Sequence, residues 1–365
     1  MDLKIIRHSL RTLIIIIILV SIYGCGITKP RGTGASGAGP YDPNYTSGIS
    51  ALHVSGNTII NAFGTQIVLQ GINAIDPIKH SNDTGNYQGA GVFNETYYAT
   101  MSAWGANVVR IPVQPDNWHS TSNASAVAII DKAVGWAKAH NMYVILDFHS
   151  IGMLHTGIYQ VDAFNDYSTS MNEVINFWNT MAIHYKNEPV VAAYEIFNEP
   201  VHIGSIYSMT DWASWKSDAE SIIDSIRSLD PDKMIVVGGL QYAYDLSPAA
   251  STPISRTNIV YATHVYPKSN TNHSWDTAFG TLALSYPIIA TEVGYLPGST
   301  KDPIGELNYT PGTFHDDLKA YIKAKKISWI AWSFSTVWEP QLLNDTTSFT
   351  PSTAGSFFKN WLSGN

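Results

Sequence analysis

The stretch VAAYEIFNEP, residues 191–200, is the clearest structural signal in the sequence. Its first seven residues are almost wholly apolar, which is typical of a strand that is buried on both faces of a parallel sheet. The run then reaches Asn198 and Glu199, and Pro200 follows, which cannot donate a ladder hydrogen bond and should stop the strand. The stretch therefore predicts a central strand over Val191–Glu199 with polar side chains at its carboxyl end.

Seven further apolar runs of this kind occur along the chain, and longer amphipathic stretches typical of helices separate them. The runs are Ile67–Asn73, Asn107–Pro112, Tyr143–His149, Met234–Gly239, Ile259–His264, Ile288–Glu292 and Trp329–Phe334. The helix-like stretches include Ala126–His140, Ser170–Tyr185, Trp212–Ser228 and Phe314–Ala324. Eight buried strands that alternate with helices, over roughly 315 residues, predict an α/β fold: a (β/α)8 TIM barrel that forms one catalytic domain.

Barrels of this kind carry their chemistry at the carboxyl ends of the strands. Polar residues at those ends are therefore functional candidates, whereas polar residues in mid-strand are not. The strand ends supply acids, imidazoles, amides, a guanidinium and aromatic rings: Asn73, Arg110, Asp147, His149, Asn198, Glu199, Gln241, His264, Tyr266, Glu292 and Trp332. Any one of these could merely solvate a loop, but the whole set converging on one mouth indicates a site.

The composition limits the partners that this site can take. Charged residues make up 14% of the chain, and 21 Lys and Arg against 29 Asp and Glu give a net charge of −8. A polyanion would be repelled on average, so no nucleic acid is expected as a partner. Aromatic residues make up 12%, with 11 Trp and 20 Tyr, which suits a neutral, polyhydroxylated partner.

Glu199 and Glu292 end the candidate fourth and seventh strands. Two carboxyl groups that face each other across a barrel mouth are the apparatus of glycosidic bond cleavage. One protonates the leaving oxygen, and the other attacks the anomeric carbon or activates a water. The pair predicts a glycoside hydrolase.

The motif Asn198-Glu199-Pro200 resembles the Asn-Glu-Pro signature of the clan A glycoside hydrolases, family 5 in particular. The resemblance continues, unit by unit, at Asn73, Arg110, His149, His264, Tyr266, Glu292 and Trp332. It implies a cellulase-like endo-β-1,4-glucanase in which Glu199 is the acid/base and Glu292 is the nucleophile. The second-strand Arg110 is then the arginine that the family keeps near the nucleophile.

The remaining site residues have physical roles that fit this scheme. Arg110 and the Tyr266 hydroxyl would hold Glu292 ionised by charge and hydrogen bonding. Asn198 would donate to the sugar 2-hydroxyl, and His264 would lie beside Glu199. Glu195 and Asp147 would brace the interior of the barrel. Binding or supporting roles are expected for the other site residues: His149, Trp332 as a sugar platform, and Trp338 as a further platform in the loop after the eighth strand.

We therefore expect an endo-acting retaining enzyme that hydrolyses internal β-1,4-glucosidic bonds of cellulose or related glucans. An endo-β-1,4-mannanase or another β-glycanase of the same family is the alternative, because these enzymes share the site. A sugar-binding lipoprotein, or a barrel without activity, is the non-enzymatic alternative, but neither explains the two glutamates. The mechanism calls for no cofactor and no metal, and we expect a monomer.

The N-terminal segment predicts export. Lys4, Arg7 and Arg11 precede an apolar run, Leu13–Val20, in the layout of a signal peptide over residues 1–24. The next residues resemble a lipobox that ends at Cys25, the one cysteine of the chain, which would then be lipidated. Cleavage elsewhere, or an uncleaved anchor, is the alternative.

A Gly/Ser/Pro-rich tether follows over residues 25–48, and the catalytic domain occupies 49–365. The tether contains a Gly-x-Gly-x-x-Gly spacing, but no strand precedes it, so we interpret it as chance. The protein is thus expected to be secreted and tethered to the outer cell surface or membrane, and the N-terminal anchor is its only expected membrane contact.

Overall fold

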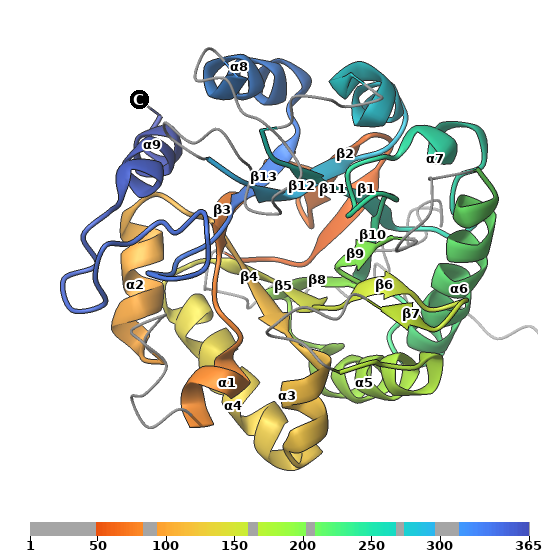
Figure 1. Cartoon of the computed structure of the whole chain (residues 1–365), viewed down its shortest axis with the longest axis horizontal. Helices are drawn as coiled ribbons and strands as arrows, with labels where there is room; N and C mark the ends of the chain where they lie inside the picture. The colour runs from red at the N-terminus through yellow and green to blue at the C-terminus, as the bar shows by residue number, and fades with distance from the viewer. Residues whose placement is uncertain are drawn as a thin grey trace, which may run out of the picture. The chain divides into compact units, whose positions relative to one another are not determined.

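In the computed structural model of the chain, eight parallel strands close into a barrel at the centre of a ring of helices (Figure 1). The structure describes residues 49–82, 93–159, 167–201, 209–267, 274–295 and 314–364. The barrel strands, in spatial order, are β10 (Met234–Gly238), β11 (Ile259–Val265), β12 (Ile288–Val293), β13 (Ser328–Ala331), β3 (Gln70–Asn73), β4 (Val108–Val113), β5 (Tyr143–Phe148) and β8 (Val191–Glu195). The predicted TIM barrel is confirmed.

Each of the eight predicted runs overlaps one barrel strand, but the fourth run was predicted too long at its carboxyl end. Strand β8 ends at Glu195, and Glu199–Pro200 form a separate short strand, β9, which pairs with β6 (Ile151–Met153) above the barrel. The prediction that Pro200 stops a barrel strand is wrong. Pro200 is tolerated within β9 because that strand pairs with β6 on one side, so a missing N–H breaks no ladder in the barrel.

Helices surround the barrel between successive strands (Figure 1). The described helices are α1 (Pro77–Asn82), α2 (Glu95–Ala103), α3 (Pro115–Ser120), α4 (Asn123–Ala139), α5 (Met171–Tyr185), α6 (Met209–Arg227), α7 (Ser247–Ser251), α8 (Phe314–Lys325) and α9 (Thr353–Leu362), with the short η1 (Asp276–Gly280) and η2 (Leu282–Leu284). Side-chain oxygens start several of them: Asn94 caps α2, Ser122 caps α4, Ser170 caps α5 and Ser352 caps α9. These caps satisfy backbone N–H groups that have no partner inside the helix.

The core lies both inside the barrel and between the barrel and its helices. Every residue of β4, β5, β8 and β11 is buried, as expected of strands that are covered on both faces. Two tryptophans fasten helices to the carboxyl ends of strands. Trp178 of α5 donates to the Ile196 carbonyl at 3.0 Å, and Trp215 of α6 donates to the Gly238 carbonyl at 2.9 Å. The first bond holds the segment that leads from β8 to the functional residues, and the second holds the carboxyl end of β10.

A hairpin that the sequence did not predict, β1 (Leu52–Ser55) with β2 (Thr58–Asn61), lies at the opposite end of the barrel. The Val54 N–H donates to the Asn258 side chain at 2.8 Å, just before β11 begins. The small strands β6 and β7 (Ile158–Tyr159) lie with β9 at the carboxyl end instead. Among the described residues, no helix combines the length and apolar character needed to cross a membrane.

Candidate active site

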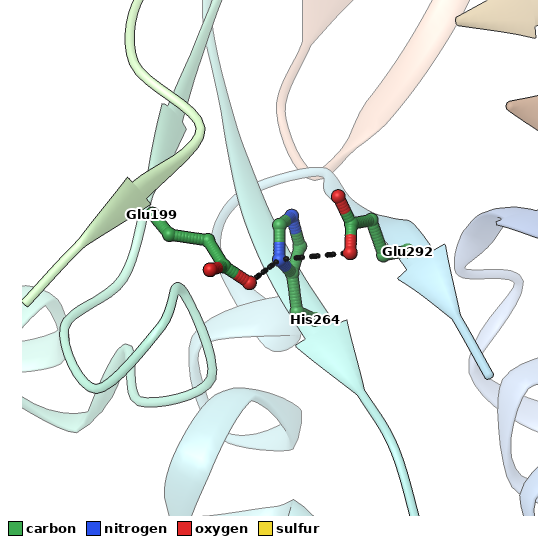
Figure 2. A group of neighbouring side chains, drawn as sticks. All are labelled: Glu199, His264 and Glu292. Carbon is green, nitrogen blue, oxygen red and sulfur yellow. Dashed lines mark hydrogen bonds and ion pairs between the residues drawn. The ribbon is translucent and has the colours of Figure 1, made fainter. Parts of the chain in front are cut away.

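Glu199 and Glu292 face each other across the imidazole of His264 (Figure 2). Glu199 begins β9, Glu292 lies near the end of β12, and His264 lies near the end of β11. His264 Nδ1 is 2.8 Å from Glu199 Oε1 and 3.5 Å from Glu292 Oε2. One ligand atom from each of the three side chains lies within 4.8 Å of the other two. Two carboxyl groups and one imidazole, all three buried, thus form one compact cluster.

The backbone around Glu199 is held by hydrogen bonds to the segment after β5. The N–H of Asn198 donates to the Phe148 carbonyl at 3.0 Å, and the N–H of Glu199 donates to the Ser150 carbonyl at 3.0 Å. Glu199 therefore occupies a fixed position above the barrel even though it lies beyond the end of β8.

Glu292 is held by a donor on each oxygen. The Tyr266 hydroxyl donates to Oε2 at 2.6 Å, and Arg110 Nη1 donates to Oε1 at 3.1 Å. Tyr266 reaches this position because its ring lies against Gly294: a Cβ on that residue would be 2.1 Å from Tyr266 Cδ1. Both donors favour the ionised form of Glu292.

Arg110 organises the floor of the site. Its side chain is completely buried and donates to Asn73 at 2.9 Å, to Asn198 Oδ1 at 2.7 Å and to Glu195 Oε2 at 2.6 Å. It also forms an ion pair with Asp147 Oδ2 at 2.9 Å. Because Asn198 Oδ1 accepts from the guanidinium, the amide nitrogen of Asn198 remains as the donor for a ligand.

The site holds more buried carboxyl groups than one guanidinium can neutralise. Burial raises the pKa of Asp147 to about 7 and also raises the pKa of Glu195 and of Glu292, while the charge of Arg110 opposes each rise. Burial lowers the pKa of His264 to about 4, so this imidazole is neutral near pH 7 and carries one N–H. Burial and the charge of Glu292 raise the pKa of Tyr266, which keeps its hydroxyl proton as a donor.

An aromatic pocket lies beside His149. The His149 ring stacks on Trp332, with centroids 5.5 Å apart and planes inclined by 4°, and Asp147 Oδ2 fixes His149 Nδ1 at 2.7 Å. Trp332 and Trp338 line the same pocket. A flat apolar wall with polar neighbours suits a ligand that is itself partly apolar and partly polar.

The structure brings most of the sequence-predicted residues together, with one exception and one correction. Gln241 is the exception. It follows β10, and among the described residues no hydrogen bond or ion pair joins its side chain to this cluster. Arg110 was counted among the strand-end residues, but it lies in the middle of β4, which continues to Val113. The long side chain rises from mid-strand through the barrel to the mouth, so the rule that mid-strand polar residues lack a function does not hold here. Cys25 lies outside the described residues.

Sequence reasoning missed several polar residues near the site. Thr291 donates to Glu195 Oε1 at 2.8 Å, and Asp76, Lys79 and Gln114 line the pocket beside Trp332. Gln114 comes directly after the last residue of β4, so the strand-end rule would have found it had the strand been extended to Val113. Thr291 carries no signal of its own, because a threonine within an apolar run is typical of any strand.

Among the described residues, one group of three side chains could offer ligand atoms to a metal ion, namely Glu199, His264 and Glu292. Arg110 and Tyr266 already contact the two oxygens of Glu292. A guanidinium next to a cation would repel it, so the charge of Arg110 disfavours a cation at this position.

A TIM barrel with two facing glutamates at the carboxyl ends of its strands has the architecture of a glycoside hydrolase. Residues 60–337 match the cellulase family, glycosyl hydrolase family 5. The chain belongs to this family, as the sequence motifs predicted.

The relatives agree with this assignment. An endoglucanase of Clostridium saccharobutylicum is 30% identical over 63% of this chain and 46% of its own length, and endoglucanase A of Butyrivibrio fibrisolvens is 27% identical over 73% and 56%. The chain thus spans about half the length of these relatives. A β-glucanase of Saccharophagus degradans has a solved structure that is 33% identical, with a TM-score of 0.77 over 89% of this chain and 97% of that one.

Proposed function

We propose that the protein is an endo-acting, retaining β-glycanase that hydrolyses internal β-1,4-glucosidic bonds of cellulose or related glucans. The observation that carries the proposal is the spacing of Glu199 and Glu292, whose oxygens approach within 4.8 Å across His264. Retaining glycosidases hold their two carboxyl groups about 5–5.5 Å apart, whereas inverting enzymes leave about 6.5–9.5 Å for a water. The short spacing supports direct attack by a carboxylate.

In the first step, the ionised Glu292 attacks the anomeric carbon while the protonated Glu199 gives its proton to the leaving glycosidic oxygen. The bond from the anomeric carbon to that oxygen breaks, and a glycosyl ester forms on Glu292. In the second step, Glu199 takes a proton from a water, which attacks the same carbon and releases Glu292. The free amide nitrogen of Asn198 supports a hydrogen bond to the 2-hydroxyl during both steps.

The choice of a β-1,4-glucan rests on two observations. The pocket lined by His149, Trp332 and Trp338 offers indole faces, on which the apolar face of a pyranose can pack. The relatives named above are two endoglucanases and a β-glucanase, and the β-glucanase was also solved in complex with cellotetraose at 32% identity to this chain. A mannan or another β-glycan remains the second candidate, and relative rates on β-1,4-glucan, mixed-linkage glucan, mannan and xylan distinguish them.

The first expected result concerns stereochemistry. Because two displacements at one carbon restore its configuration, the product formed first from cello-oligosaccharides will be the β-anomer. Proton NMR in the first minutes of hydrolysis, before mutarotation, measures it. An α-anomer at the earliest times would require an inverting mechanism and would remove Glu292 as the nucleophile.

The second expected result concerns the platform. Trp332→Ala will raise KM for cello-oligosaccharides by about tenfold, since an apolar contact of roughly 1.5 kcal/mol is lost. Trp332→Phe, which keeps a flat ring, is the matched control and should lose less. Steady-state kinetics measures both. A fall in kcat with an unchanged KM would instead mean that Trp332 acts by packing His149.

We also propose that the protein is exported and tethered through a lipid on Cys25, a residue outside the described part of the chain. The basic start, the apolar run and the cysteine that follows support this. Metabolic labelling with a radioactive fatty acid, compared between the natural chain and Cys25→Ser, tests it, and equal labelling would reject it.

A further inference from the structure

Glu195 is a carboxyl group of the site that lies too deep to meet a ligand, since the side chain is 0% exposed. It ends β8 and has a neighbour on each oxygen. Oε2 accepts from Arg110 Nε at 2.6 Å, and Oε1 accepts from the Thr291 hydroxyl at 2.8 Å. Burial raises the pKa of Glu195, but the guanidinium opposes that rise, and two donors of this kind favour the charged form.

His264 lies between Glu195 and the acid/base. Its Nδ1 faces Glu199 Oε1 at 2.8 Å, and its Nε2 faces Glu195 Oε1 at 4.0 Å. Nε2 is buried and has no hydrogen-bond partner among the described residues. The ionisable groups around this imidazole are Glu199 from β9, Glu292 from β12, Glu195 from β8, Arg110 from β4 and His149 after β5. Of these, Glu195 is the one that Nε2 faces.

We propose that Glu195 is a positioning residue for the acid/base: its carboxylate holds the single proton of His264 on Nε2, so that Nδ1 accepts the proton of Glu199. The inference rests on the proposed function, because it assigns Glu199 the role of proton donor. Glu195 also orients Arg110, which holds Glu292 and Asn198. One buried carboxylate thus acts on the imidazole beside Glu199 and on the guanidinium beside Glu292.

The physical argument follows from the two tautomers of a neutral imidazole. With the proton on Nδ1, His264 would donate to Glu199 and favour its ionised form, which cannot act as an acid. With the proton on Nε2, Nδ1 accepts from the protonated Glu199 and favours the acid. A negative charge 4.0 Å from Nε2 favours the second tautomer, whereas the charge of Glu292, whose Oε2 lies 3.5 Å from Nδ1, favours the first. Arg110 and Tyr266 already bond the two oxygens of Glu292, which weakens its pull on the Nδ1 proton.

Glu195→Gln tests the proposal, since the variant removes the charge but keeps the shape and an oxygen that can accept from Arg110. The amide nitrogen of the new side chain would donate to Nε2 and reverse the tautomer. In full-length protein, the alkaline limb of kcat/KM for cello-oligosaccharides should move by about one pH unit to lower pH. KM should change less than kcat, because Glu195 is fully buried.

The leaving group provides a second readout that a purely structural role would not move. Dinitrophenolate leaves without protonation, so dinitrophenyl β-cellobioside depends little on a general acid in its first step. Above the alkaline limb, Glu195→Gln should lose about tenfold more rate on cello-oligosaccharides than on the aryl glycoside. Equal losses on both substrates with no change in the pH profile would overturn the proposal.

Asp147→Asn is the matched control. Asp147 is equally buried and pairs with the same guanidinium at 2.9 Å, but its other neighbour is His149 instead of His264. Because the charges of Asp147 and Glu199 also repel each other, the alkaline limb of Asp147→Asn should move to lower pH, but by less than that of Glu195→Gln. An equal shift would reduce the effect to the loss of any buried charge. If the natural chain hydrolysed neither substrate, the proposed function would fail, which is a different outcome.

Thr291→Val is a second variant that keeps the test open if Glu195→Gln does not fold. It removes the hydroxyl that donates to Glu195 Oε1 and keeps a side chain that is branched at Cβ. Since the charged form of Glu195 loses one donor, the alkaline limb should move in the same direction by a smaller amount. Thermal unfolding of each variant verifies the fold. If Glu195→Gln is unfolded and Thr291→Val is folded, an alkaline limb of Thr291→Val that does not move would reject the proposal.

Discussion

Glu292→Gln is expected to lower kcat on cello-oligosaccharides by about 10⁴-fold or more, because a neutral amide cannot attack the anomeric carbon. The change is nearly isosteric. The amide oxygen can still accept from Arg110, so the fold and the position of the side chain should persist. The loss is therefore expected in turnover and not in the amount of folded protein.

Covalent trapping identifies the same residue directly. A 2-deoxy-2-fluoro cellobioside with a dinitrophenyl leaving group should form a slowly hydrolysed ester, and mass spectrometry should find the added mass on the peptide that contains Glu292. Glu95→Gln, at an exposed glutamate on α2 whose side chain contacts His140, is the control and should keep the natural rate. A label on any other glutamate, or turnover that survives Glu292→Gln, would remove Glu292 as the nucleophile.

The barrel could be predicted because its strands are buried on both faces. A run such as Tyr143–Phe148 has no polar face that could be confused with a loop, and every residue of it is buried. The hairpin of β1 and β2 escaped notice for the opposite reason: its strands are four residues long and half-exposed, and they lie outside the strand–helix repeat. Patterns predict repeated, buried elements better than short additions at the ends of a barrel.

The residues that form the site could also be predicted, but how deep in the barrel each of them begins could not. The strand-end rule placed Arg110 at the mouth by position, whereas it reaches the mouth by the length of its side chain from the middle of β4. The same rule set Glu195 aside as interior bracing. That position is confirmed by its burial, yet the contacts with Thr291 and His264 depend on the register of three strands that are far apart in sequence. Register across non-adjacent strands leaves no local pattern to read.

The second large effect is expected at Glu199, and it should depend on the leaving group. Glu199→Ala removes the acid of the first step and the base of the second, so the rate on cello-oligosaccharides should fall by about 10²–10⁴-fold. With dinitrophenyl β-cellobioside, the first step needs no acid and the ester on Glu292 should accumulate. The steady state is then limited by a water that no base activates.

Azide separates the two glutamates, because this anion attacks without giving up a proton. In Glu199→Ala it can occupy the space vacated beside His264, on the face of the sugar from which the leaving group departed. The rate on the aryl glycoside should rise with azide, and NMR should identify a β-glycosyl azide as the product, whereas azide should not accelerate the natural chain. An α-glycosyl azide from Glu199→Ala would mean that the anion replaces the nucleophile, so the roles of Glu199 and Glu292 would have to be exchanged. Since Arg110 and Tyr266 each donate to an oxygen of Glu292 and favour its ionised form, the arrangement of charges favours the first product.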